Sequence, residues 1–335
     1  MPSQTLTDLQ TMSPGAPFAN HDVIACIAAR VASVRDLWAL TATCRIARAC
    51  RSDAYVISRY LLRTYPAWKA LFVAIDRIHD AALALEVVRH LVPAVLAECG
   101  TLDVCNVAYV AVYYHRYLIS RNKSGRTALH EAARNGRDKI VEYLVQRGAG
   151  VDQGTASSET PLMLAAANRH LAAVQALLSH GADVCKRRVP QDYSVLMLAC
   201  AVRDNESVVS ALLAAGADPN DVRDVEGDEG YQGIEGDDIS ALMMAASRGS
   251  VGMVDALIAA GADVNYLSNA RMTALVYAID YGEDDSIRAL LAAGAEVHHV
   301  CIFTNWNAYE YAKKGVSGVP ADIIKALRAR LREYE

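Results

Sequence analysis

Apolar and polar positions between residues 122 and 298 recur in the same order five times. Each copy opens on a Thr or Ser, reaches an alanine five residues later, then shows paired apolar residues at helical spacing, as in Ile140-Val141 and Leu144-Val145. A hydroxyl before an apolar run favours a helix start, and glycine most easily takes the left-handed conformation past a helix end. Each copy therefore predicts two short antiparallel helices. The opening residues are Thr127, Thr160, Ser194, Ser240 and Thr273, and the closing Gly-Ala pairs begin at Gly148, Gly181, Gly216, Gly261 and Gly294.

The spacing and the opening motif together resemble the ankyrin repeat. Successive closing glycines are 33, 35, 45 and 33 residues apart, and the stretches Thr127-Ala-Leu-His-Glu-Ala and Thr160-Pro-Leu-Met-Leu-Ala carry the family's opening box almost intact. The resemblance implies an all-α solenoid of five ankyrin repeats over 122–298, since one copy cannot bury its apolar face alone. It also implies that His130 bonds between repeats. We expect antiparallel helix pairs with one long loop at 221–238, followed by a C-terminal capping repeat over 299–335.

The N-terminal part departs from this pattern. Residues 1–17 predict a disordered tail, and residues 18–65 resemble an F-box, the helical segment that docks a Skp-type adaptor of a cullin-RING ubiquitin ligase. The resemblance implies that apolar residues fill the adaptor groove; they are Val23, Ile24, Ile27, Val31, Leu37 and Leu40. The other interpretation is an ordinary helical cap, because Phe18-Ala19 and Ala47 depart from the usual Leu-Pro and Trp. Residues 66–121 predict a helical linker or N-terminal cap, and a degenerate repeat within it is an open alternative. Pro93 should kink or break the second helix of this segment.

One position of the repeat suggests where a partner binds. In this family the residue before the box alanine tends to face the concave groove, and here it is Glu131, Leu164, Leu198, Met244 and Tyr277, with Tyr193, Arg248, Met272 and Tyr281 nearby. Four of these five are large and apolar, which favours a protein-binding stripe formed by Leu164, Leu198, Met244, Tyr277, Tyr193 and Met272. The alternative is that these side chains belong to the core.

The fourth copy carries an acidic insertion at 221–238 with a net charge of −7, more than the −5 of the whole chain. Its four glycines favour a solvated hairpin tip, and the alternative is a contact for a basic partner. The spacing does not fit a calcium loop.

Candidate chemistry changes this picture little. His298-His299-x-Cys301 contains metal-ligand residue types, but His298 takes the hairpin position of Asn220 and Asn265, and a fourth ligand is not evident. We therefore expect a structural histidine, no metal and no cofactor. The eight cysteines show neither zinc spacing nor a disulfide framework, which favours a reducing compartment.

The sequence thus predicts a non-enzymatic adaptor. The repeats would bind a target protein, and the F-box-like segment would recruit a Skp-type adaptor. This domain order resembles proteins of large DNA viruses and intracellular bacteria, which implies the host cytosol; without that origin, a cytoplasmic or nuclear location is expected. The negative net charge argues against nucleic acid as a partner, and the apolar runs are too short to span a membrane. The alternative is a plain ankyrin scaffold or inhibitor with a helical cap and no ubiquitin link.

Overall fold

The computed structural model describes residues 58, 61–62, 67–78, 80–99, 125–223, 238–314 and 318–334. The chain divides into two compact units, one of residues 1–121 with 146–149 and one of residues 122–145 with 150–335. The predicted tail over 1–17 lies outside the described residues. So does almost all of the F-box-like segment over 18–65, including its six proposed adaptor contacts.

The described part of the first unit includes helices α6 (Ala67–Arg77) and α7 (Ala81–Cys99), which pack against each other. The Asp80 carboxylate accepts a 2.8 Å hydrogen bond from the Leu83 backbone N–H at the start of α7. Pro93 does not break this helix, because α7 continues through it to Cys99. Burial of Leu91, Val92 and Val95 on both sides of the proline explains how packing offsets its missing N–H.

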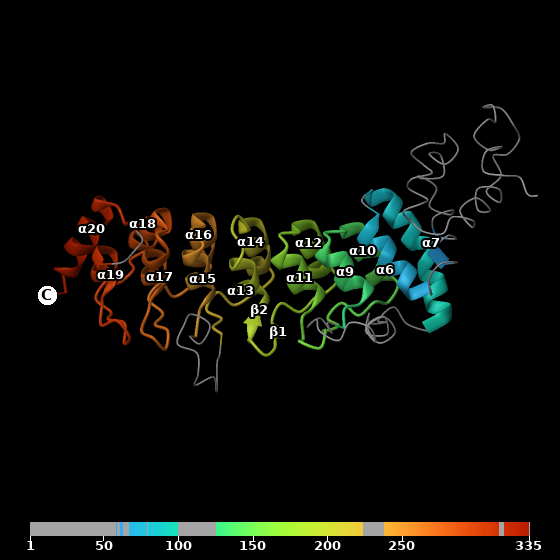
Figure 1. The fold of residues 1–335 in the computed structure, drawn as a ribbon, viewed down its shortest axis with the longest axis horizontal. Helices are drawn as coiled ribbons and strands as arrows, with labels where there is room; N and C mark the ends of the chain where they lie inside the picture. Colours follow the sequence, from blue (N-terminus) through green and yellow to red (C-terminus); the bar gives the residue numbers. More distant parts are fainter. Residues whose placement is uncertain are drawn as a thin grey trace, which may run out of the picture. The chain divides into compact units, whose positions relative to one another are not determined.

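The second unit consists of stacked helix pairs (Figure 1). The first helices of the pairs pack against one another in chain order, and so do the second helices from α12 onward. The first helices are α9 (Ala128–Arg134), α11 (Pro161–Ala167), α13 (Val195–Cys200), α15 (Ala241–Ser247), α17 (Ala274–Tyr281) and α19 (Ala308–Lys314). The second helices are α10 (Asp138–Gln146), α12 (Leu171–Ser179), α14 (Glu206–Ala214), α16 (Val251–Ala259), α18 (Asp284–Ala292) and α20 (Ala321–Leu331).

The predicted helix boundaries are confirmed at both kinds of end. All five opening hydroxyl residues are N-caps whose side-chain oxygen accepts a backbone N–H three residues on. The closing glycines have positive φ, for example 94° at Gly261 and 92° at Gly294. The sequence signals at these ends therefore reflect hydrogen bonding and backbone conformation directly.

The connections between pairs are longer than the sequence suggested. We expected one long loop, but other connections among the described residues are also long: α16 ends at Ala259 while α17 begins at Ala274, and α18 ends at Ala292 while α19 begins only at Ala308. One hairpin contains a short antiparallel sheet of β1 (Arg187–Arg188) and β2 (Tyr193–Ser194). The acidic insertion is closed at its base by an isolated bridge between Val222 and Ser240. Because the helices are short, many backbone N–H and C=O groups lie in these connections and must find hydrogen-bond partners there.

His130 joins the first two copies from inside the core. It is fully buried, and its Nδ1 atom accepts the Thr127 backbone N–H at 3.0 Å. Its Nε2–H donates to the Glu159 carbonyl at 3.0 Å, 29 residues along the chain. Burial lowers the pKa of the imidazole from its usual value of 6.5, so the neutral ring is favoured. The inter-repeat role implied by the resemblance is confirmed.

Candidate functional site

The residues predicted to form an apolar stripe have different degrees of burial. Leu164 and Tyr277 are 5% and 2% exposed, so their expected exposure to a partner is wrong. Leu198 on α13 and Met244 on α15 are half-buried, and these two helices pack against each other. The stripe is therefore reduced to a central pair. Leu164 and Tyr277 instead fill space in the stack, as apolar side chains at helical spacing commonly do.

Three of the proposed neighbours keep partial exposure. Tyr193 and Met272 are half-buried, and Tyr281 is 45% exposed. Arg223, at the base of the acidic insertion, donates to the Tyr193 hydroxyl at 3.0 Å and lies 5.0 Å from the centre of its ring. The central pair is therefore flanked by aromatic and sulfur-containing side chains, and Tyr193 connects this region to the insertion.

The hairpins after the second helices carry a polar latch from one copy to the next. The Oδ1 atom of Asn220 accepts the Asp263 backbone N–H at 2.7 Å, and its Nδ2–H donates to the Gly261 carbonyl at 3.0 Å. Asn265 accepts the Glu296 backbone N–H at 2.8 Å in the same way. Within the hairpin, the Asp263 carboxylate accepts the Asn265 backbone N–H at 2.9 Å. The Gly-Ala-Asp-x-Asn sequence thus encodes an inter-repeat contact.

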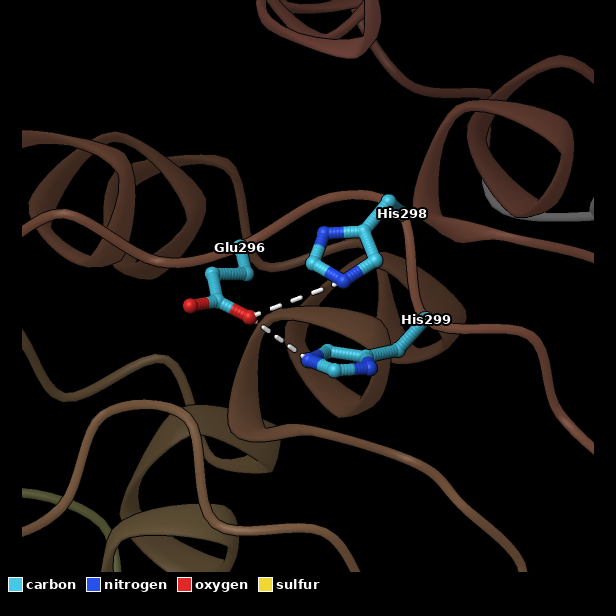
Figure 2. Close-up of side chains that lie close together, drawn as sticks. All are labelled: Glu296, His298 and His299. Atoms are coloured by element: carbon cyan, nitrogen blue, oxygen red, sulfur yellow. Dashed lines mark hydrogen bonds and ion pairs between the residues drawn. The ribbon is translucent and has the colours of Figure 1, made fainter. Parts of the chain in front are cut away.

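The last hairpin breaks this pattern and forms a side-chain cluster. Glu296 stands where Asp263 stands one copy earlier, His298 replaces Asn265, and His299 replaces Tyr266. Figure 2 shows both imidazole rings turned toward one carboxylate oxygen of Glu296. The His299 Nε2 atom lies 2.7 Å from that oxygen and the His298 Nε2 atom lies 3.8 Å from it.

The ring of His298 is positioned by packing. Its centre lies 4.2 Å from that of His299 and 4.5 Å from that of Tyr334, near the end of the chain. Its Nδ1 atom is buried without a hydrogen-bond partner among the described residues, and its Nε2 atom is too far from Glu296 for a hydrogen bond. In the described part of the chain, this is the one group of three His, Cys, Asp or Glu residues arranged to hold a metal ion.

Cys301, the third candidate ligand in the sequence, takes a different place. It is buried, and burial acts to raise the pKa of its thiol; hydrogen bonds from the Tyr311 hydroxyl and from Thr304 and Phe303 outweigh this and lower it. Burial also raises the pKa of the Tyr311 hydroxyl to about 12. Sequence reasoning thus paired the histidines with the wrong third residue. The sequence signal for this cluster was Glu296, which stands where the previous copy has Asp263.

Comparison with known proteins identifies the repeats. A family model described as ankyrin repeats (3 copies) matches residues 78–188, 149–223 and 196–300, which together cover more than half of the chain. The chain belongs to the ankyrin-repeat family. The match begins at residue 78, after α6 and before α7, so it includes α7 as well as the copies from residue 122 onward.

Curated relatives match over short stretches. The mouse "B-cell lymphoma 3 protein homolog" is 45% identical over 65 residues, 19% of this chain and 14% of that protein. The Caenorhabditis elegans "Ankyrin repeat and KH domain-containing protein mask-1" is 32% identical over 133 residues, 39% of this chain and 5% of that protein. A transient receptor potential channel homolog of the same worm is 32% identical over 112 residues, 33% of this chain and 9% of that protein. The chain spans only a small fraction of each relative, and their names differ widely, so the likeness identifies the ankyrin repeats and no particular activity.

Ankyrin repeats imply a role in protein–protein interaction. Among the described residues, no helix combines the length and the apolar character needed to cross a membrane.

Proposed function

We propose that this ankyrin-repeat protein is a non-enzymatic adaptor that binds a target protein on the side of its first helices. The observation that carries the proposal is the pair formed by Leu198 and Met244. These residues occupy the same repeat position on two helices in contact, and both keep part of their apolar surface accessible. Neighbouring apolar side chains that remain accessible commonly mark an interface.

The surroundings of the pair favour a protein partner. Tyr193 and Met272 stand on the hairpins that lead into α13 and α17, and both are half-buried. Tyrosine is frequent at interface hot spots, and methionine adapts to irregular apolar surfaces. Arg223 contacts Tyr193 at the base of the insertion. The acidic stretch 224–237 follows Arg223 directly in the chain. We therefore propose that the target presents apolar side chains beside a basic patch.

The experiment compares two double variants, each of which replaces two half-buried apolar residues by serine. Leu198→Ser with Met244→Ser changes the proposed interface. Leu213→Ser with Ile258→Ser changes half-buried residues on the second helices α14 and α16. Each substitution should lower the free energy of unfolding by about 1 kcal/mol, since only part of the side chain is buried. Affinity capture with the full chain, followed by mass spectrometry, should lose its specific partners with the first variant only. Loss with both variants, or with neither, would refute the site.

The proposal extends to the F-box-like segment, on sequence grounds. Residues 18–65 present the apolar spacing described above, and we propose that they recruit a Skp-type adaptor to the bound target. Mixing the purified chain with such an adaptor tests this by size-exclusion chromatography. Ile24→Asp and Leu37→Asp should abolish the complex by placing an unpaired charge in an apolar interface, while Leu9→Asp in the N-terminal tail should not. If the unaltered chain forms no complex, the plain scaffold or inhibitor without a ubiquitin link is the better function.

For the compartment, we propose the cytosol. Cys185, Cys200 and Cys301 are free thiols, and thiols persist in reducing compartments. A host cytosol follows only if the chain is encoded by a virus or an intracellular bacterium.

A further inference from the structure

The last hairpin combines three donor groups that ligate transition metals. Glu296 contributes a carboxylate oxygen, and His298 and His299 each contribute an imidazole nitrogen; the three donor atoms lie within 4.8 Å of one another. Two imidazoles and one carboxylate form a known zinc-binding set that leaves a fourth position for water. Imidazole does not suit Ca²⁺ or Mg²⁺, which take oxygen ligands.

The distances suit a tetrahedral centre. With zinc–ligand bonds near 2.1 Å, neighbouring donor atoms in a tetrahedron stand about 3.4 Å apart. The two donor distances to the Glu296 oxygen are 2.7 Å and 3.8 Å, one on each side of this value. Shifts of under 1 Å would therefore bring each nitrogen to this separation from the oxygen, and Figure 2 shows the rings already aimed at it.

The state of His298 favours a ligand. Neither of its ring nitrogens has a hydrogen bond among the described residues, although the Nδ1 atom is buried. The nitrogen that faces Glu296 is Nε2, and it is the atom that would ligate a metal. A ring that packing aims at a carboxylate, and that lacks a hydrogen bond of its own, has a nitrogen lone pair available for a metal. His299 would ligate through Nε2 once the proton on that atom moves to Nδ1.

The repeat pattern shows that the cluster is a local departure. At the corresponding positions, Asp218 and Asp263 accept the backbone N–H two residues on, at 2.9 Å each. No such bond forms between Glu296 and His298; the longer side chain reaches His299 instead. Helix α20 is followed by Arg332-Glu333-Tyr334 and not by a Gly-Ala pair, and the Arg330 side chain donates to the Ala295 carbonyl at 3.0 Å.

We propose that Glu296, His298 and His299 bind one zinc ion, with water completing the coordination. The ion would fasten the end of the fifth repeat to the segment that enters the C-terminal capping pair. This revises our expectation that the chain binds no metal. It is independent of the proposed target-binding face, which lies on α13 and α15.

The test uses the full chain and Zn²⁺ in a non-chelating buffer with a phosphine reductant. Isothermal titration calorimetry should show one saturable site per chain. The matched variant is Glu296→Asp with His298→Asn and His299→Tyr, which installs the sequence of Asp263, Asn265 and Tyr266 on the same backbone. We expect its zinc affinity to fall at least about tenfold, as the loss of ligands requires. Without zinc, the variant and the unaltered chain should have similar melting temperatures. Adding Zn²⁺ should raise the melting temperature of the unaltered chain only.

Two controls assign the ion to this cluster. His180→Asn removes a histidine elsewhere, and Cys185→Ser removes an exposed thiol; both should leave zinc binding unchanged. Mg²⁺ should give no binding at the same concentrations. The proposal is overturned if the unaltered chain shows no saturable site, if the triple variant binds as tightly, or if Cys185→Ser abolishes binding.

Discussion

The hairpins after α16 and α18 begin on the same backbone and differ in what their side chains do. Both start at a glycine with φ near 93°, 94° at Gly261 and 92° at Gly294. In the first, Asn265 holds the next copy through the Glu296 backbone N–H. In the second, His298 makes no such bond and faces Glu296 with His299 (Figure 2). The first hairpin therefore holds its neighbour through Asn265, whereas in the second the side chains of His298 and His299 meet Glu296 instead.

The largest effect should come from the inter-repeat contact of His130, whose side chain is fully buried. His130→Ala removes the ring that satisfies the Thr127 N–H and the Glu159 carbonyl, and it leaves a cavity. We expect a loss of about 3 kcal/mol in the free energy of unfolding, measured by urea denaturation. His180→Ala is the control, because this ring bonds only within its own helix end and should cost far less.

Acid should cause part of the same loss without a substitution. The folded-state pKa of His130 lies below 6.5 because of burial, so its contribution is complete above the unfolded value and declines as pH falls through the folded one. Stability should therefore decrease below about pH 6.5. The decrease should be smaller in a His130→Gln variant, and an equal pH slope in both proteins would exclude His130 as its source.

The two glycines should behave alike. Gly261→Val and Gly294→Val place a β-branched residue in the left-handed region, where neither new Cβ meets an atom within 4 Å. The cost is thus conformational, about 2 kcal/mol for each. Thermal unfolding should show similar shifts for both variants. A much larger effect at one site would mean that the two hairpins differ in backbone as well as in side chains.

The hairpin positions after these glycines should not behave alike. Asn220→Ala removes two hydrogen bonds between copies and should cost about 1 kcal/mol, because both freed backbone groups can reach water. His298→Asn removes no side-chain hydrogen bond within the described part of the chain and should change zinc-free stability by less than about 0.5 kcal/mol. Chemical denaturation of both variants in the presence of a chelator checks this difference. Equal losses in the free energy of unfolding would contradict the role of Asn220 in joining two copies.

Much of the fold could be predicted because its signals are local. A Thr or Ser cap, an alanine five residues later and a closing glycine each act through a few neighbouring backbone groups, so Thr273 and Gly294 marked helix ends correctly. The family match over residues 78–300 then confirmed the ankyrin repeats. Pro93 did not mark a helix end, because packing around it allows α7 to continue.

The candidate sites depended on contacts between copies, which sequence spacing does not contain. Leu164, Leu198, Met244 and Tyr277 occupy the same repeat position, yet only the packing of neighbouring pairs left Leu198 and Met244 accessible and buried the other two. Likewise, Asn205 is buried with its side chain donating to the Ala166 and Ala199 carbonyls at 3.0 Å, and no motif marked it.

The sequence by itself thus determined the repeat and its helix ends, because these follow from local hydrogen bonding and a fixed period; the inter-repeat role of His130 came from the resemblance to the family. The tertiary structure decided which side chains remained available. It turned Cys301 toward Tyr311 and set the rings of His298 and His299 toward Glu296, because packing decides which of several nearby groups meet.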